Sequence, residues 1–546
     1  MQDMTGGEAV YEALRALGVE HVFGIVSVHN IPIYDVIARK GGITTIDVRH
    51  EQAGLHAADG YSRATGRLGV AITSTGPGAA NAMSGLFEAE FASSRVLMIT
   101  GQVETQYYGK GKGFLHEAER QTDMLRTVAP HTESVRRTED IAETIVRTAR
   151  AVTTGRPRPG AVEIPIDLQY NRANVDVPHI EGWPRVQPKR EAIAEAAAAL
   201  RESRRTVIWA GGGVNTAGAE TELVQLAEAL NAPVFTSING RGAIPEDHPL
   251  ALGPLANMPN FAETLAQAEV ILAVGTRFQG GATRNWQLRL GGKLVHIDAD
   301  PGVVNRNYQA AVSVIGDARL ALSGLLSDLQ GAGNEPGFTE QARAIRDEAR
   351  TQIRTEIGPD YEAIMDIVRD ELPRDAIIAR DATIPAYLWG NRLLPIYEPR
   401  TSLNPTSAAI GPGVPLGMGA AIGSGKKTAV IQGDGGFMLS IGELATCAQY
   451  NIPVVICVFN DRGYGVLRTI EARTFEGRQF GVDLATPDFA AVAKGMGVHG
   501  ETVRGVDEFR DAFRRAVAAD GPVLLDIDTT VLTPMGGLGS PPPRRS

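Results

Sequence analysis

Two aspartates, Asp434 and Asp461, each follow a short apolar run in the last quarter of the chain. These runs, at residues 429–432 and 454–459, predict buried strands. Because the carboxyl ends of parallel strands meet at one edge of an α/β sheet, we expect both carboxylates at the same ligand-binding edge. Mg²⁺ prefers one or two carboxylates together with phosphate oxygens. The spacing therefore predicts a magnesium site that also receives a phosphate-bearing ligand.

Glycines surround the first of these aspartates, namely Gly433, Gly435 and Gly436. A helical pattern follows them as far as Tyr450. Backbone amides at the start of a helix lack partners within the helix and attract phosphate groups. Many strand-to-helix turns contain a Gly-Asp-Gly, so this motif needs support from a second region of the chain.

A third carboxylate, Glu51, falls at the ligand edge of another predicted sheet. Helical patterns at 31–39 and 55–65 alternate with apolar strands at 22–26, 43–48 and 68–73. This alternation predicts a doubly wound parallel sheet. Glu51 stands where the second strand meets its helix. It either stabilises the positive end of that helix, which is a common role, or belongs to a ligand site.

Two histidines are candidates for proton transfer. His29 lies in the loop between Gly24 and Ile31, and His116 lies in a glycine-containing loop at 107–117. A neutral imidazole exchanges protons near pH 7 without large tuning. The alternative is that both are ordinary loop histidines.

The rest of the chain repeats the same architecture. Strands at 206–210, 233–236, 270–274 and 293–297 predict a Rossmann-like sheet, although its glycines lack the Gly-x-Gly-x-x-Gly pattern of dinucleotide binding. Segments at 171–189 and 331–340 have the composition of linkers. We predict an α/β fold of three doubly wound parallel-sheet domains, at 1–180, 190–335 and 355–535, with a disordered tail at 536–546.

Composition excludes several classes of protein. A length of 546 residues predicts three or four domains, and 43% hydrophobic with 21% charged residues is ordinary for a globular protein. A net charge of −10 counts against nucleic acid as a partner. The cysteines, Cys447 and Cys457, stand in apolar settings typical of a reducing compartment. With neither a signal-peptide core nor an apolar run of membrane-spanning length, we expect no membrane association and a cytoplasmic location.

Several motifs together resemble one enzyme superfamily. They are Gly433-Asp434-Gly435 with an oxygen ligand 27 residues after the aspartate, Arg49-His50-Glu51, Ala58-Asp59-Gly60-Tyr61, and Gly76-Pro77-Gly78 with Asn81. The chain resembles the thiamin diphosphate-dependent superfamily of acetolactate synthase, pyruvate decarboxylase and benzaldehyde lyase. The resemblance covers nearly the whole chain, and implies a pyrimidine-binding domain, a Rossmann-like middle domain and a diphosphate-binding domain. Most members have asparagine where Asp461 stands.

The resemblance also implies roles for individual residues. The glutamate at the position of Glu51 hydrogen-bonds the aminopyrimidine ring and favours the tautomer that removes a proton from the thiazolium ring. Ile410 would wedge between the two rings, and the carbonyl of Ala408 would hold the amino group. Mg²⁺ would be bound by Asp434, Asp461 and the backbone oxygen of Gly463. The remaining expected cofactor contacts are Gly76, Asn81, Gly433, Gly435, Gly436, Tyr464 and Val466.

Departures from acetolactate synthases guide the choice of reaction. Gly281 stands where those enzymes have an arginine that grips a 2-oxo acid, and Asn257-Met258-Pro259 replaces a Met-His-Gly segment. Ile470 replaces a tryptophan, and Leu467 replaces the catalytic glutamate of pyruvate decarboxylases. Benzaldehyde lyase has a histidine at the place of His29. These features favour a 2-oxo acid decarboxylase or a 2-hydroxyketone lyase with carboligase activity.

Three alternatives stay open. The first is an authentic acetolactate synthase with FAD in the middle domain, and the second is a 2-hydroxyacyl-CoA lyase with an adenine nucleotide there. The third is a non-catalytic homologue, against which the retained Glu51 and Asp434 argue. In the superfamily the cofactor lies between two subunits. We therefore expect a homodimer or homotetramer that acts on a small 2-oxo acid or acyloin.

Overall fold

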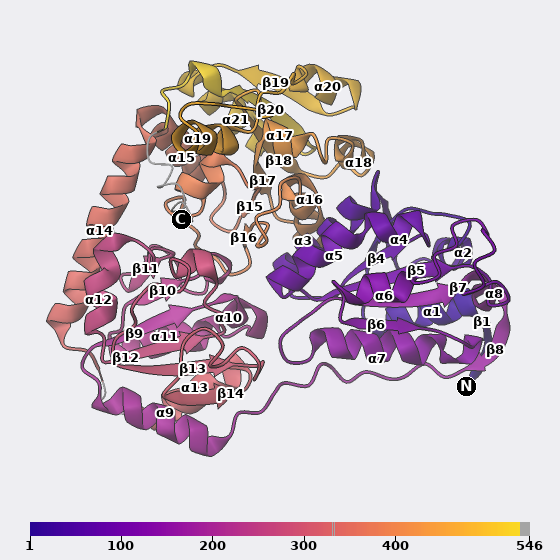
Figure 1. Cartoon of the computed structure of the whole chain (residues 1–546), viewed down its shortest axis with the longest axis horizontal. Coiled ribbons are helices and arrows are strands. Elements are labelled where there is room, and N and C mark those ends of the chain that lie inside the picture. Colours follow the sequence, from indigo (N-terminus) through magenta and orange to yellow (C-terminus); the bar gives the residue numbers. More distant parts are fainter. Residues whose placement is uncertain (330, 332, 536–546) are drawn as a thin grey trace.

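Three six-stranded parallel sheets build the protein, as the computed structural model shows (Figure 1). The structure describes residues 1–329, 331 and 333–535, so the tail expected at 536–546 lies outside the described residues. The predicted α/β class with three doubly wound sheets is confirmed. Within the described residues, no helix is both long and apolar enough to cross a membrane.

The N-terminal sheet has the strand order β3-β2-β4-β5-β7-β6. Its strands are β2 (His21–Gly24), β3 (Thr44–Asp47), β4 (Gly69–Thr73), β5 (Val96–Gln102), β6 (His131–Ser134) and β7 (Gly160–Pro165). Its helices are α1 (Gly6–Ala16), α2 (Ile31–Lys40), α3 (Glu51–Thr65), α4 (Pro77–Asn81), α5 (Met83–Ala92), α6 (Gln121–Arg126), α7 (Ile141–Thr153) and α8 (Ile166–Tyr170). Strands β4, β5 and β7 are buried along their whole length, as central strands covered on both faces must be.

A small antiparallel pair lies beside this sheet. Strand β1 (Gln2–Thr5) pairs with β8 (Arg172–Val175). The second of these strands falls inside the segment predicted as a linker, so that prediction is wrong for residues 172–175. The sequence gives no warning of this pair, because only the folded N-terminal domain brings the two segments together.

The central sheet has the order β11-β10-β9-β12-β13-β14, and this order reverses between β9 and β12. The strands are β9 (Thr206–Ala210), β10 (Val234–Thr236), β11 (Ala251–Gly253), β12 (Val270–Val274), β13 (Lys293–Asp298) and β14 (Val312–Ile315). The helices are α9 (Arg190–Glu202), α10 (Gly212–Ala217), α11 (Glu220–Leu230), α12 (Ala262–Gln267) and α13 (Ala318–Asp328). This is the Rossmann strand order, in which ligands bind where the order reverses.

A long helix, α14 (Pro336–Ile357), runs from the central domain to the C-terminal domain (Figure 1). It begins inside the segment expected to be a linker, so the linker prediction for 331–340 is wrong from Pro336 onward. Phe338, Ala342, Ala349 and Ile353 line its buried face at helical spacing. Their burial against other elements stabilises this helix, whose other face is polar.

The C-terminal sheet repeats the connectivity of the N-terminal sheet, in the order β16-β15-β17-β18-β20-β19. Its strands are β15 (Ile377–Arg380), β16 (Ser402–Leu403), β17 (Thr428–Gly433), β18 (Val454–Asn460), β19 (His499–Val503) and β20 (Val523–Asp528). Its helices are α15 (Pro359–Glu371), α16 (Gly413–Ser424), α17 (Asp434–Phe437), α18 (Glu443–Gln449), α19 (Gly465–Thr474), α20 (Phe489–Gly495) and α21 (Val506–Ala518). The helix expected to run to Tyr450 is broken into α17 and α18 by turns at residues 438–442.

Helices α3 and α16 join the N-terminal and C-terminal domains (Figure 1). They cross at two glycines. A Cβ atom on Gly60 would lie 2.0 Å from the carbonyl oxygen of Leu416, and one on Gly419 would lie 1.9 Å from that of Ala57. The backbones therefore touch, and no larger residue fits at either crossing point.

Candidate active site

Asp434 and Asp461 meet at one edge of the C-terminal sheet, as the strand pattern predicts. Strands β17 and β18 are adjacent and parallel, and each aspartate directly follows its strand. The backbone amide of Gly463 donates to Asp434 Oδ2 at 2.8 Å, which turns the loop after β18 toward the first carboxylate. Gly465 must be glycine, because a Cβ there would lie 1.8 Å from Asp461 Oδ2.

Asp434 is buried, Asp461 is half-buried, and the two carboxylates repel each other. Burial, and then the charge of Asp461, raise the pKa of Asp434 to about 7. Burial likewise raises the pKa of Asp461. The nearby Arg468 lies 3.6 Å from Asp461 but also pairs with Asp483 at 2.9 Å. A divalent cation would relieve this repulsion, so the residues present fit a metal ion.

Backbone and ligand oxygens must complete such a metal site. Within the described residues, no group of three or more His, Cys, Asp or Glu side chains could hold a metal ion. Two carboxylates with the carbonyl of Gly463 leave positions for phosphate oxygens and water, as Mg²⁺ prefers.

The glycines around Asp434 keep the backbone bare. A Cβ on Gly433 would lie 2.8 Å from Thr383 Oγ1, and one on Gly435 would lie 2.6 Å from the ring of Tyr464. On Gly436 it would lie 3.0 Å from Asp381 Oδ2. No larger residue fits at these three glycines, because neighbouring residues fill the space that a side chain would need.

The turn before α16 carries Ala408 and Ile410. Ala408 has a φ of +64°, which is unusual for a residue with a Cβ. Ile410 is 36% exposed at the tip of the turn. The amide of Gly411 donates to Asp381 Oδ2 at 2.8 Å.

Asp381 supports this turn, and sequence reasoning missed it. It lies at the carboxyl end of β15, and burial raises its pKa to about 6. Its position directly after a buried strand is the same signal that identified Asp434.

Glu51 is the first residue of α3, and its carboxylate is held by a neighbour. Asn81, the last residue of α4, donates from Nδ2 to Glu51 Oε2 at 3.0 Å. Gly76 precedes α4 with a φ of +59°, and its amide donates to Gln121 Oε1 at 2.8 Å. The structure thus joins Glu51 to Asn81, and Gly76 precedes the short helix α4 that ends at Asn81.

His29 and His116 lie side by side although they are far apart in sequence. Their ring centroids are 5.2 Å apart. His29 is 2% exposed, and burial, followed by the charge of His116, lowers its pKa. His116 Nδ1 lies 3.4 Å from Ser74 Oγ, next to the turn at Gly76.

A buried carboxylate, Glu163, fixes the loop that carries His116. It accepts hydrogen bonds from Gln102 at 3.0 Å, Gln121 at 2.9 Å, Tyr108 at 2.7 Å and Ser134 at 2.8 Å. Sequence reasoning missed this network, because its members come from five separate elements.

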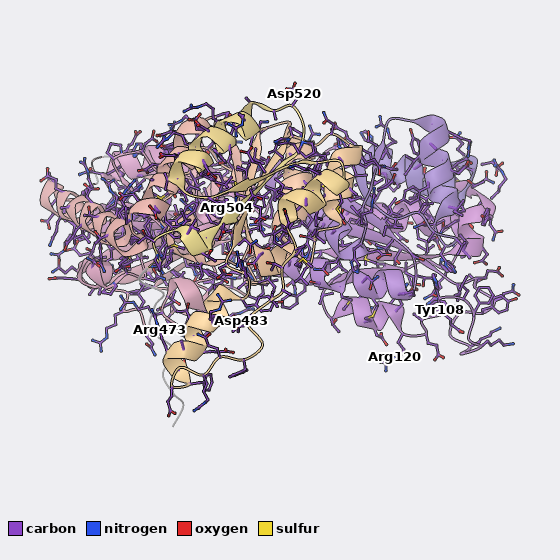
Figure 2. All side chains as sticks on the ribbon, turned by 90° about the horizontal axis from the view of Figure 1, so that it is seen from above. Tyr108, Arg120, Arg473, Asp483, Arg504 and Asp520 are labelled. Atoms are coloured by element: carbon purple, nitrogen blue, oxygen red, sulfur yellow. The ribbon has the colours of Figure 1, made fainter. Side chains whose placement is uncertain are left out.

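The start of α19 lies against the Asp434 loop. The ring of Tyr464 packs on Gly435, and Val466 follows in the first turn of the helix. Leu467 and Ile470 are 50% and 38% exposed. Figure 2 shows the segment that includes Arg473 and Asp483 on the same edge of the molecule as the loop marked by Tyr108 and Arg120.

Glu51 belongs to the N-terminal domain, whereas Asp434 and Asp461 belong to the C-terminal domain. The chain's own N-terminal and C-terminal domains meet through other residues. The amide of Arg49 donates to Glu443 Oε1 at 2.9 Å, and the hydroxyl of Tyr450 donates to Asp47 Oδ2 at 2.7 Å.

A cleft of about 1080 Å³ opens where the central strand order reverses. Residues of all three domains line it, and arginines are prominent among them. Burial lowers the pKa of Arg95 and of Arg277 to about 10. Gly281, the position that departs from acetolactate synthases, also lines this cleft.

Family models match each of the three domains. Residues 4–124 match the thiamine pyrophosphate enzyme N-terminal TPP binding domain, residues 193–325 the central domain and residues 386–527 the C-terminal TPP binding domain. A relative that is 33% identical across 99% of the chain supports the same assignment. The chain belongs to the thiamine pyrophosphate enzyme family. The resemblance predicted from the motifs is thereby confirmed.

Relatives within the thiamine pyrophosphate enzyme family carry different names. The 33% identical relative is a "Probable acetolactate synthase large subunit" of Methanocaldococcus jannaschii, 94% of which is covered. A "Probable 2-ketoarginine decarboxylase AruI" of Pseudomonas aeruginosa is 32% identical over 96% of this chain and 94% of its own length. Acetolactate synthase isozyme 3 large subunit of Escherichia coli is 31% identical over 91% and 89%.

Proposed function

We propose that the protein is a thiamin diphosphate- and Mg²⁺-dependent enzyme that cleaves and forms carbon–carbon bonds. It acts as a 2-oxo acid decarboxylase or as a 2-hydroxyketone lyase with carboligase activity. The meeting of Asp434 and Asp461 at one sheet edge carries this proposal, because a divalent cation would relieve the repulsion between the two carboxylates. Membership of the thiamine pyrophosphate enzyme family supports it.

The C-terminal half-site would hold the diphosphate end of the cofactor. Asp434, Asp461 and the carbonyl of Gly463 would bind Mg²⁺, and the bare backbone at Gly433, Gly435 and Gly436 would receive the phosphates. Ile410 and the carbonyl of Ala408 would face the two rings. Tyr464 and Val466 would close this end of the site.

The N-terminal half-site would hold the pyrimidine end. When bound, thiamin diphosphate supplies a nucleophilic ring carbon and an electron sink for carbon–carbon bond cleavage. Glu51 would hold a proton on the pyrimidine ring, while Asn81 fixes the direction of its carboxylate. The turn at Gly76 would line the same end.

His29 and His116 would exchange protons with the substrate. Because burial lowers the pKa of His29, its imidazole is neutral near pH 7 and can accept a proton. Leu467 and Ile470 would offer an apolar wall to the substrate, a 2-oxo acid or an acyloin.

A second copy of the chain would complete each site. The two half-sites lie on different domains, and within one chain these domains meet through α3, α16 and the contact of Arg49 with Glu443. Apolar side chains next to the C-terminal half-site are exposed, including Leu439 at 57% and Met438 at 43%. A homodimer or homotetramer would cover them.

The second candidate is an authentic acetolactate synthase with FAD. The cleft in the central domain favours it, because its volume and arginines suit a nucleotide. Gly281 and the buried Met258 count against it, since both depart from that enzyme's pattern. An adenine nucleotide, as in 2-hydroxyacyl-CoA lyases, would fit the same cleft. The visible spectrum of the purified protein tests this choice, because bound flavin gives a yellow absorption band.

A panel of 2-oxo acids and acyloins tests the main proposal. Wild-type protein with thiamin diphosphate and Mg²⁺ should turn over at least one of them, and Glu51→Gln should lower kcat by at least about a hundredfold. Full activity in Glu51→Gln would remove Glu51 from the mechanism. Absence of turnover on the whole panel, with cofactor bound, would favour the non-catalytic alternative.

A further inference from the structure

The turn at residues 404–408 is held by a carboxylate from another domain. Glu88 on α5 is fully buried. It accepts hydrogen bonds from the amide of Thr406 at 2.6 Å, from the amide of Ser407 at 3.0 Å and from the hydroxyl of Ser407 at 2.5 Å. Three donors on one carboxylate fix two successive peptide planes.

The residue that follows has an unfavourable backbone conformation. Ala408 lies in the left-handed region, at a φ of +64°. A residue with a Cβ keeps such a conformation only where its surroundings impose it. The hydrogen bonds that Thr406 and Ser407 donate to Glu88 impose it here, together with one from the amide of Ala408 to the carbonyl of Pro405 at 3.1 Å.

Further contacts tie the turn to its neighbours. Arg63 of the N-terminal domain donates to the carbonyl of Asn404 at 2.8 Å, and it lies 3.8 Å from Glu88. Asn239 of the central domain donates to Thr406 Oγ1 at 2.9 Å. All three domains therefore meet at this short segment.

We propose that Glu88 is a positioning residue for the cofactor, acting through the 404–408 turn. It sets the carbonyl of Ala408 and the side chain of Ile410, which by the proposed function, on which this inference rests, face the cofactor rings. Glu88 itself touches neither cofactor nor substrate. Its role is to hold a strained turn in the binding geometry before the cofactor arrives.

The variant Glu88→Gln in the full-length protein tests this role. Its amide group cannot accept hydrogen bonds at both ends, so the turn loses at least one donor–acceptor pair. Hydrogen–deuterium exchange of the 404–411 segment in cofactor-free protein should quicken by at least about fivefold. The dissociation constant of thiamin diphosphate with Mg²⁺, measured by calorimetry, should rise about tenfold.

Glu90→Gln is the matched control. Glu90 lies on the same helix and pairs with Arg158 at 2.7 Å, away from the turn. Its replacement should leave both the exchange of the 404–411 segment and the cofactor affinity as in the wild type. If Glu88→Gln does not fold, Ser407→Ala removes one donor and should move both quantities in the same direction by about threefold.

The outcomes separate this inference from the proposed function. Unchanged exchange in Glu88→Gln, or faster exchange with unchanged cofactor affinity, would overturn the positioning role. A wild-type protein that binds no thiamin diphosphate would instead overturn the proposed function. In that case the exchange data would still show whether Glu88 holds the turn.

Discussion

At the scale of single residues, the candidate site carries groups that cost stability. Asp434 and Asp461 are held together in a buried setting, and Ala408 is held in a left-handed conformation. Neither arrangement helps folding. Sites of this kind are retained because a ligand uses them, and the remainder of the fold compensates for the cost.

Replacing Asp434 with asparagine should therefore separate stability from binding. The melting temperature of the cofactor-free protein should rise by a few degrees, because one of two repelling carboxylates is gone. Retention of thiamin diphosphate in the presence of Mg²⁺ should fall by at least about tenfold, because the amide oxygen of asparagine is uncharged and binds the metal ion less strongly than a carboxylate. Differential scanning fluorimetry and calorimetry measure the two effects.

The surface variant Asp247→Asn serves as the control, since Asp247 pairs only at the surface with Arg374. Asp247→Asn should change neither the melting temperature nor the retention of thiamin diphosphate by a comparable amount. Wild-type cofactor affinity in Asp434→Asn would show that Asp434 is not a ligand.

A buried histidine on α3 predicts acid sensitivity. Burial lowers the pKa of His56 to about 3. The unfolded chain protonates this group near pH 6.5, so the unfolded state binds more protons below that pH. The free energy of unfolding should fall as the pH drops from 6.5 toward 3, by up to about 1.4 kcal/mol per pH unit from this residue.

The variant His56→Gln should flatten this pH dependence, as measured by urea unfolding at several pH values. Only the slopes of the free energy of unfolding against pH are compared, because glutamine at this position also changes the packing. His499→Gln, at an exposed position, controls for the loss of an imidazole. Equal slopes in wild type and His56→Gln would contradict the prediction.

At the scale of elements, the crossing of α3 and α16 fixes the position of the N-terminal domain relative to the C-terminal domain. Gly60 and Gly419 allow backbone contact at that crossing, and the surrounding residues of both helices are buried. The same helices lie next to the site, since α3 begins at Glu51 and α16 follows the turn that carries Ile410.

Alanine at position 419 should disrupt this crossing. The added Cβ would meet backbone rather than a flexible side chain, so the helices must separate. We expect a loss of roughly 2–4 kcal/mol in the free energy of unfolding, or no soluble protein. Gly337→Ala in α14 is the control, because nothing lies within 4 Å of the added Cβ. Similar melting temperatures for the two variants would refute the close approach.

The predicted bounds of an element match the structure where the spacing of apolar residues in the sequence agrees with the burial of their side chains. The strands at Thr206–Ala210 and Val270–Val274 have the bounds predicted from the sequence. The break between α17 and α18 and the extent of α14 were missed, because both depend on contacts with other elements. Local propensity carries no information about such contacts.

At the scale of the whole molecule, the residues of the proposed site fall into two groups, with Glu51 in the N-terminal domain and Asp434 in the C-terminal domain. Loop 104–120 and the segment after α19 lie along one edge, as Figure 2 shows through Tyr108 and Asp483. In the dimer proposed above, a partner subunit would cover the exposed side chains of Leu439 and Met438 and supply the Glu51 half of the site.

Mixing two inactive variants tests this arrangement. After subunit exchange between Glu51→Gln and Asp434→Asn proteins, mixed dimers contain one site with both native residues. Activity should recover to about a quarter of the wild-type value per chain. A mixture of Asp434→Asn with Asp461→Ala is the control and should stay inactive, because both changes affect the same half-site. Failure to recover activity despite exchange would place both halves of the site within one chain.

The sequence by itself determined which kinds of side chain the candidate site contains and their order along the chain. The strand-helix alternation predicted three doubly wound sheets, because it depends on local spacing, and Gly433-Asp434-Gly435 and Glu51 carried the resemblance to the family. Only the tertiary structure placed His29 against His116, Glu163 beneath the loop, and Glu88 against the turn at Ala408. These pairs are distant in sequence, and their contacts exist only after sheets and helices pack, which no local pattern encodes.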